Sequence, residues 1–195
     1  MALTYPLNIP TTIGIESIEL RAINAVATSQ SPFTYKQQII SHQGQRWEAS
    51  VSIPSTRRDL AADWKAFLTA LKGQTGTFLL GDPDYATPRG DVSSCTLSGN
   101  AGDESVSVTM TGTLRAGDYI QLGSGSTTKL HQVLQDQTGD GTLEIWPKLR
   151  ADYTDETVVF NNPQGLFRLK GNSNSWQINS SSFYSISFEC VEVII

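Results

Sequence analysis

The side chains best suited to chemistry in this sequence are few and scattered. Asp82 and Asp84 are a close pair of carboxylates of the kind that can serve as acid and base, but they flank Pro83 in a stretch typical of a turn. The only two histidines are His42 and His131, and His131 lies in an alternating strand pattern with no carboxylate or cysteine at a metal-ligand spacing. We therefore expect neither a catalytic residue nor a metal ligand among these groups.

The segment 136–141 (DQTGDG) comes closest to a metal-binding loop. It places oxygen-bearing side chains at positions 1, 3 and 5 of a calcium loop and glycine at position 6. Position 12 of such a loop needs a bidentate glutamate, and this chain has Pro147 there. A tight turn between two strands, which favours Gly and Asp, accounts for the same residues. We expect a turn here, and no metal or other cofactor in the protein.

Motifs for covalent or phosphate chemistry are absent from the sequence. There is no nucleophile elbow, no Walker loop, no GxGxxG after a strand and no paired CxxC, so the prediction is that the chain is not an enzyme. Cys95 and Cys190 lie far apart, and Cys190 falls in an alternating strand pattern, which favours buried, reduced thiols over a disulfide.

Composition and charge favour a folded protein that does not bind nucleic acid specifically. The chain has 195 residues, 38% of them hydrophobic, which is ample for a core. The net charge of −5 is spread along the sequence, which argues against a groove that neutralises phosphates. We see no leader-like start and no apolar run of about 18 residues, so we expect no membrane insertion and folding in a cytoplasm.

A strand, a helix and a second strand are predicted between Trp47 and Pro83. Apolar and polar residues alternate over 47–53, and Thr56 stands where a hydroxyl can cap a helix over 57–72. Gly73 suits the helix end, and 77–80 (TFLL) is typical of a buried strand. The apolar stripe of the helix is formed by Leu60, Trp64, Phe67, Leu68 and Leu71.

The first part of the chain is expected to form a sheet that this helix covers. Residues 1–8 suit an arm or edge strand, 13–21 a strand and 25–32 a loop. Gln43-Gly44-Gln45 is typical of a tight connection, which predicts a hairpin over 34–53.

A separate module is predicted between residues 91 and 163. Short strands alternate there with turn residues and show no helical period, which favours a small β-barrel of the OB or SH3-like kind inserted into a domain made of residues 1–90 and 164–195. The alternation of 184–190 returns to the first sheet, and 171–182 is expected to be a polar loop. The predicted strands of the module are 95–97, 106–110, 119–122, 130–135, 142–146 and 157–160.

Several motifs give the sequence a family resemblance. They are WKAFL at 64–68 with LKG at 71–73, GTFLLGDP at 76–83, PRG at 88–90, AGDYI at 116–120 and LEIWPKLR at 143–150. Together they resemble the distal tail proteins of long-tailed bacteriophages over about residues 45–170. The resemblance implies a mainly β, tail-tube-like sandwich or split barrel with one helix and an outer module.

The resemblance also implies a function. Members of that family form a hexameric ring at the virion tail tip, which joins the tail tube protein to hub and fibre proteins and surrounds the DNA channel. We expect neighbour contacts from the N-terminal arm and from segments 22–32 and 171–182, which have few apolar residues. The alternative is a carbohydrate-binding host-recognition module that uses Trp176, Tyr85 and Tyr153.

Overall fold

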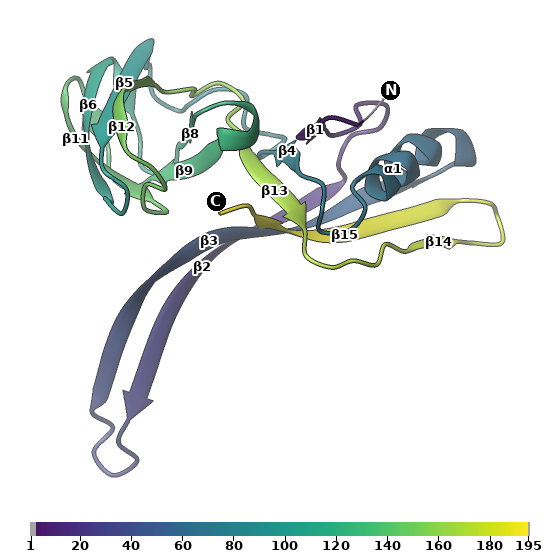
Figure 1. Cartoon of the computed structure of the whole chain (residues 1–195), viewed down its shortest axis with the longest axis horizontal. Helices are drawn as coiled ribbons and strands as arrows, with labels where there is room; N and C mark the ends of the chain where they lie inside the picture. The colour runs from purple at the N-terminus through teal and green to yellow at the C-terminus, as the bar shows by residue number, and fades with distance from the viewer. Residues whose placement is uncertain (1–2, 195) are drawn as a thin grey trace.

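A computed structural model describes residues 3–194 and is mainly β, with one α-helix and two principal sheets in that range (Figure 1). The predicted fold class, mainly β with a single helix, is confirmed. The larger sheet carries the helix on one face, and the module lies at the other end of the molecule from that helix. No helix in this range is long and apolar enough to cross a membrane.

The larger sheet has seven strands and is built from both ends of the chain. Short β1 forms one edge and pairs in parallel with β4, while β2 forms the other edge. The C-terminal β15 lies in the middle, between β3 on one side and both β13 and β14 on the other. In spatial order the strands are β1 (Leu7–Asn8), β4 (Phe78–Leu80), β13 (Gly165–Leu169), β15 (Tyr184–Glu192), β3 (Gln37–Thr56) and β2 (Ser17–Gln30), with β14 (Trp176–Ile178) beside the first part of β15.

Helix α1 (Arg58–Ala70) covers the apolar face of this sheet. Its buried residues Trp64 and Phe67 pack against Phe188 of β15 and Phe78 of β4. Two details of the predicted helix are wrong. Arg57 occupies the N-cap position without any side-chain cap, so Thr56 does not play that role. Leu60 is partly exposed, and Ala61 takes its place in the buried stripe.

The alternating residues of β3 and β15 divide the sheet into an apolar face and a polar face. Val51 is opposite Phe188 on the helix side, and Ser52 is opposite Ser187 on the other side. Because side chains alternate across a strand, one face is buried under α1 and the other remains polar. The apolar core therefore lies between the helix and the sheet.

The module between β4 and β13 is a curled six-stranded sheet with its own apolar core. The chain just after β12 bridges back to β8, where Val159 and Gln121 exchange backbone hydrogen bonds of 2.8 and 3.0 Å. The last strand is β12, earlier than the predicted 157–160. Its strands in spatial order are β12 (Tyr153–Thr157), β5 (Ser94–Gly99), β6 (Ser105–Thr111), β11 (Gly141–Trp146), β9 (Lys129–Val133) and β8 (Tyr119–Leu122), with a side pair β7 (Thr113–Leu114) and β10 (Gln137–Thr138) and a 3-10 turn η1 (Gly125–Thr127).

The module is attached to the larger sheet around Trp47, the first buried residue of β3. The indole nitrogen of Trp47 donates to the carbonyl of Leu130 at 2.9 Å, and the Trp146 ring packs edge-on against Trp47 with centroids 4.5 Å apart. The ammonium of Lys129 donates to the carbonyl of Val193 at 2.7 Å. Leu130 accordingly belongs to the core under the helix rather than to the core of the module.

The predicted hairpin over 34–53 and the predicted loop over 25–32 are both wrong. β2 continues to Gln30 and β3 runs without interruption through residues 43–45, so the two strands form one long hairpin that turns at 31–36. The register shifts between the pairs Asn24–Gln45 and Val26–Ser41, which places extra residues of β3 in a bulge. The glycine signal at 44 therefore marks a bulge, where the Cβ of Ala25 lies 3.1 Å from the position that a Cβ on Gly44 would take.

The segment 171–182 is also more ordered than the loop that the sequence predicts. Its residues 176–178 form β14, which pairs with the first part of β15. Residues 171–175 bow away from β15 between β13 and β14.

Candidate assembly surface

The long hairpin projects from the body of the protein as a two-stranded ribbon (Figure 1). We call residues 22–44 the ribbon, because all of them are exposed except Ser31, which is partly buried. At its base, the indole nitrogen of Trp146 donates to the amide oxygen of Asn24 at 2.8 Å. Beyond the bulge, the hydrogen bonds of residues 26–41 lie within the ribbon itself. The outer ribbon is therefore held by strand pairing alone.

The side chains of the ribbon are unusual for a surface that water surrounds. No Asp, Glu, Lys or Arg occurs in it apart from Lys36 at the turn, although 17% of the whole chain is charged. Phe33, also in the turn, is 92% exposed. The ribbon's exposed large hydrophobic residues are Ile23, Val26, Phe33, Tyr35, Ile39 and Ile40. Such a concentration of exposed apolar groups is typical of an interaction site.

Both faces of the ribbon carry apolar side chains. Thr28 is opposite Ile39 and Ala27 is opposite Ile40, so the two isoleucines point to opposite faces. Ile39 is 62% exposed and Ile40 is 52% exposed. A ribbon that packed on its own protein would have one face in water and one face buried. Both faces of this ribbon are exposed.

The polar face of the larger sheet carries a network of balanced ion pairs. Lys170 lies 3.3 Å from Glu48 and 3.2 Å from Glu189, so one ammonium joins β3 to β15. Arg21 pairs with Glu19 at 2.7 Å, and Arg46 pairs with Glu48 at 2.5 Å. These pairs hold the pKa of Glu19 and Glu48 below the usual value and raise that of Lys170. The three basic and three acidic groups of this network balance one another, while Arg168, which is partly buried, lies on the same face outside these pairs.

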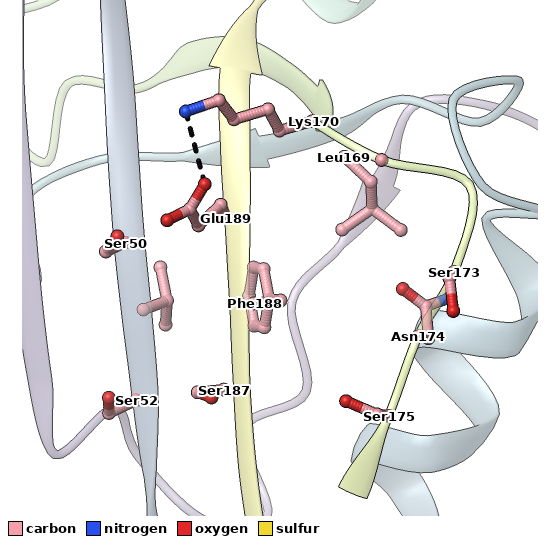
Figure 2. A pocket seen from close by; sticks show the side chains of 12 residues that line it. Ser50, Ser52, Leu169, Lys170, Ser173, Asn174, Ser175, Ser187, Phe188 and Glu189 are labelled. Carbon is pink, nitrogen blue, oxygen red and sulfur yellow. Dashed lines mark ion pairs between the residues drawn. The ribbon is translucent and has the colours of Figure 1, made fainter.

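Beside this network, the polar face has a hollow between β15 and residues 171–175, which run at a distance from that strand (Figure 2). The hollow has a volume of about 590 Å³, and most of its lining side chains are short and neutral, among them Ser50, Ser52, Ser187 and Asn174. The Lys170–Glu189 pair lies at one end of it. No histidine lines the hollow, and its two ionisable residues, Lys170 and Glu189, are paired with each other at 3.2 Å.

The histidines lie in different surroundings. His131 is buried, and its Nδ1 lies 2.7 Å from the carbonyl oxygen of Pro147. Burial, together with the nearby positive charges of Arg150 and Lys129, lowers the pKa of His131 to about 4. His42 is exposed at the bulge of the ribbon. In the described part of the chain, no group of three His, Cys, Asp or Glu side chains gathers in the way that a metal ion needs.

Three of the carboxylates that the sequence singled out, those of Asp82, Asp136 and Asp140, bind backbone amides. Asp136 accepts from the amide of Ala116 and Asp140 from that of Met110, both at 2.8 Å. Asp82 accepts from the amide of Asp84 at 3.0 Å, within the turn around Pro83. These contacts fix turns in the chain.

The two cysteines lie in different cores and are free. Cys95 is in the core of the module and Cys190 in the core under α1. Burial raises the pKa of Cys95 to about 11 and that of Cys190 to about 12.

The three aromatic residues considered for sugar binding do not form a common surface. Tyr85 packs against Tyr119, and burial raises its pKa to about 12. Tyr153 packs against the core of the module. Trp176 pairs with Ile186 in register and so lies on the helix side of the sheet, where the Lys65 ammonium is 5.8 Å from its ring centroid. The polar hollow thus has no aromatic platform from Trp176.

Comparison with known proteins does not place the chain in a family. No protein-family model matches it, and no curated protein matches it significantly.

Proposed function

We propose that this chain is a structural subunit of a phage tail tip, of the distal tail protein class that its motifs resemble. In this proposal copies of the chain form a ring, hexameric as in that class, that joins the tail tube to hub and fibre proteins. The ring surrounds the channel through which DNA passes, and the chain has no catalytic role.

The observation that supports this proposal most is the ribbon. An exposed strand pair with apolar side chains on both faces and a single charged residue is costly to leave in water and prone to unwanted pairing. Residues 22–44 also number about as many as one side of a stable protein interface, which typically involves about 20–30 residues. A partner protein that covers the ribbon removes both problems.

The free edges of the larger sheet support self-assembly in the same way. β2 leaves one edge unpaired along its whole length of 14 residues, and β14 is an edge strand at the other end of the sheet. Long unpaired edges are templates for strands of another molecule. Neighbours in a ring supply such strands on both sides.

The balanced charge on the polar face suits a place beside a DNA channel. Three of its basic groups, Arg21, Arg46 and Lys170, are paired with Glu19, Glu48 and Glu189, and the fourth, Arg168, is partly buried. Because DNA binding depends on neutralising phosphates with unpaired Lys and Arg, a paired surface lets the polymer slide without holding it.

The experiment that tests the proposal shortens the ribbon. Replacing residues 28–39 by Asn-Gly leaves the Ala27–Ile40 pair closed by a two-residue turn. We expect this variant to unfold within a few degrees of wild type, because the removed residues are exposed, and to be unable to form rings or to join tail tubes. Thermal unfolding, native mass spectrometry and negative-stain microscopy measure these outcomes.

A matched control is Leu134→Ser, which removes an exposed apolar side chain from the module instead of the ribbon. We expect this variant to assemble as the wild type does. Normal rings from the shortened variant, or a wild-type chain that stays monomeric and does not bind tail tubes, contradict the proposal.

A further inference from the structure

A second exposed apolar surface lies on the helix side of β14. Trp176 is 39% exposed and Ile178 is 57% exposed, and both point to the helix side because they pair with Ile186 and Tyr184. The half-buried Phe183 follows in the turn between β14 and β15 and lines a hollow of about 700 Å³ against the start of α1. We call Trp176, Ile178 and Phe183 the β14 patch.

The ribbon and the β14 patch lie at opposite ends of the larger sheet (Figure 1). Among residues 3–194, thirteen large hydrophobic side chains are exposed; six of them are on the ribbon and two, Trp176 and Ile178, are in the β14 patch. The other five are spread over the chain. The molecule thus has two apolar surfaces that are different in shape and cannot contact each other within one copy.

We propose that the ribbon of one copy docks on the β14 patch of the next copy, an inference that rests on the proposed function. Contacts between two different surfaces of identical subunits are heterologous, and they repeat from copy to copy until a ring closes. One ribbon and one patch per subunit satisfy this requirement. The hollow beside Phe183 has room for an aromatic ring such as that of Phe33 at the ribbon turn.

Three observations favour a second copy as the occupant of the patch. The ribbon offers large apolar groups and a single charge, Lys36, so docking it adds at most one charge to Arg57, Arg58 and Asp59, which line the hollow beside Phe183. β14 is an edge strand of three exposed residues, the apolar Trp176 and Ile178 and the neutral Gln177, so no charge protects this edge in a free subunit. The ribbon also projects away from its own patch, so it is free to reach another copy.

Two variants separate the two surfaces. The ribbon variant carries Ile39→Glu and Ile40→Glu, which place a charge on each ribbon face. The patch variant carries Trp176→Ser and Ile178→Glu. Both sets of residues are exposed, so thermal unfolding is expected to stay within a few degrees of wild type. Each variant alone should remain monomeric, with an apparent association constant at least about 30-fold below wild type, as for loss of an interface hot spot.

Mixing the two variants is the decisive measurement. The patch variant keeps an intact ribbon and the ribbon variant keeps an intact patch, so an equimolar mixture should form a 1:1 dimer that grows no further. Native mass spectrometry or light scattering with sedimentation detects this species. Rings from the patch variant alone, while the ribbon variant stays monomeric, overturn the inference and leave the proposed ring standing. A wild-type chain that never assembles overturns both.

Cross-linking gives a second readout that needs no loss of binding. Chains with Ile39→Cys and chains with Ile178→Cys are mixed and treated with a short bismaleimide, while the buried Cys95 and Cys190 stay unreactive. We expect a cross-linked dimer from this mixture and none when Leu134→Cys replaces Ile178→Cys. Absence of the dimer under conditions in which wild type forms rings contradicts the contact.

Discussion

The ring of Trp64 lies 6.0 Å from the ring of Phe188, which joins the helix to the last strand of the chain. Phe67 and Phe78 extend the same cluster, and Trp64 donates a hydrogen bond from its indole nitrogen to the carbonyl of Ile13 at 3.1 Å. The cluster therefore ties together the N-terminal segment, the helix and strands β4 and β15 of the sheet.

Trp64→Ala is expected to be among the most destabilising single changes. Truncating a large buried aromatic side chain typically costs about 3–5 kcal/mol, which is a large part of a domain's stability. Leu60→Ala on the same helix is the control, because Leu60 is partly exposed and should cost far less. Urea unfolding of both variants measures the difference. A midpoint for Trp64→Ala close to that of wild type would remove Trp64 from the core.

The buried ion pair at the junction should behave as a coupled unit. Arg150 lies 3.3 Å from Glu192, and the same carboxylate oxygen accepts from the amide of Trp47 at 3.0 Å. Removing one partner of a buried pair typically costs about 3–5 kcal/mol, since the other charge stays buried without its partner. We expect Arg150→Leu and Glu192→Leu each to destabilise in this range, and the double variant to cost clearly less than the sum. Additive losses in denaturant unfolding would show that the two groups do not interact.

His131 should make the protein sensitive to mild acid. Its pKa of about 4 in the folded state is below the value near 6.5 that it has when unfolded, so the neutral ring is favoured by folding. The stability that this contributes is full above pH 6.5, falls as the pH drops toward 4 and changes no further below it. At 1.36 kcal/mol per pKa unit the total is roughly 3 kcal/mol.

The control for that prediction is His131→Asn, whose amide can still donate to the carbonyl of Pro147. The difference in unfolding free energy between wild type and this variant should shrink between pH 7 and pH 4. A difference that stays constant over this range would mean that His131 titrates alike in both states.

Gly90 is expected to tolerate no side chain. A Cβ at this position would lie 1.8 Å from the carbonyl oxygen of Thr113, so Gly90→Ala must displace backbone where segment 84–90 meets the module. Overpacking of this kind typically costs about 1–3 kcal/mol or more. Gly171→Ala is the matched control, since nothing lies within 4 Å of its Cβ position. Equal melting temperatures for the two variants would contradict the close packing of Thr113 on Gly90.

The sequence predicts the parts of this fold in which one side of an element is buried. The stripe around Trp64 and the alternation of 184–190 are periodic because α1 and β15 each bury one face. The ribbon is exposed on both faces, so its residues follow no burial period, and Gly44 was interpreted as a turn instead of a bulge. Without a burial period, nothing in the local sequence indicates that β2 and β3 pair over such a length.

The candidate assembly surface was predicted only in part for the same reason, since segment 22–32 was expected to contact a neighbour as a loop and residues 33–44 were not expected to take part. Segment 25–32 looks like a loop and 34–41 like a polar strand of a short hairpin, because their hydrophobic residues alternate with neutral ones on two exposed faces. One signal was present in the sequence: no charged residue occurs from Ala22 to Tyr35, while Ile23, Val26 and Phe33 do. A free surface segment of that composition is rare among water-facing loops, and this pattern indicates an interface.

The chain leaves the larger sheet for the module and returns to it at neighbouring residues, so the module can be replaced without rebuilding the sheet. Leu80 and Gly165 are paired neighbours on adjacent antiparallel strands, so to the sheet the whole of 81–164 is a single hairpin connection. Loop length has only a weak effect on the cost of closing such a connection. During evolution, or in engineering, this segment can therefore be replaced by another whose ends lie side by side without a change in strand register. The replacement must cover Trp47 as Leu130 and Trp146 do now, and it must supply a partner for the buried Glu192 in place of Arg150.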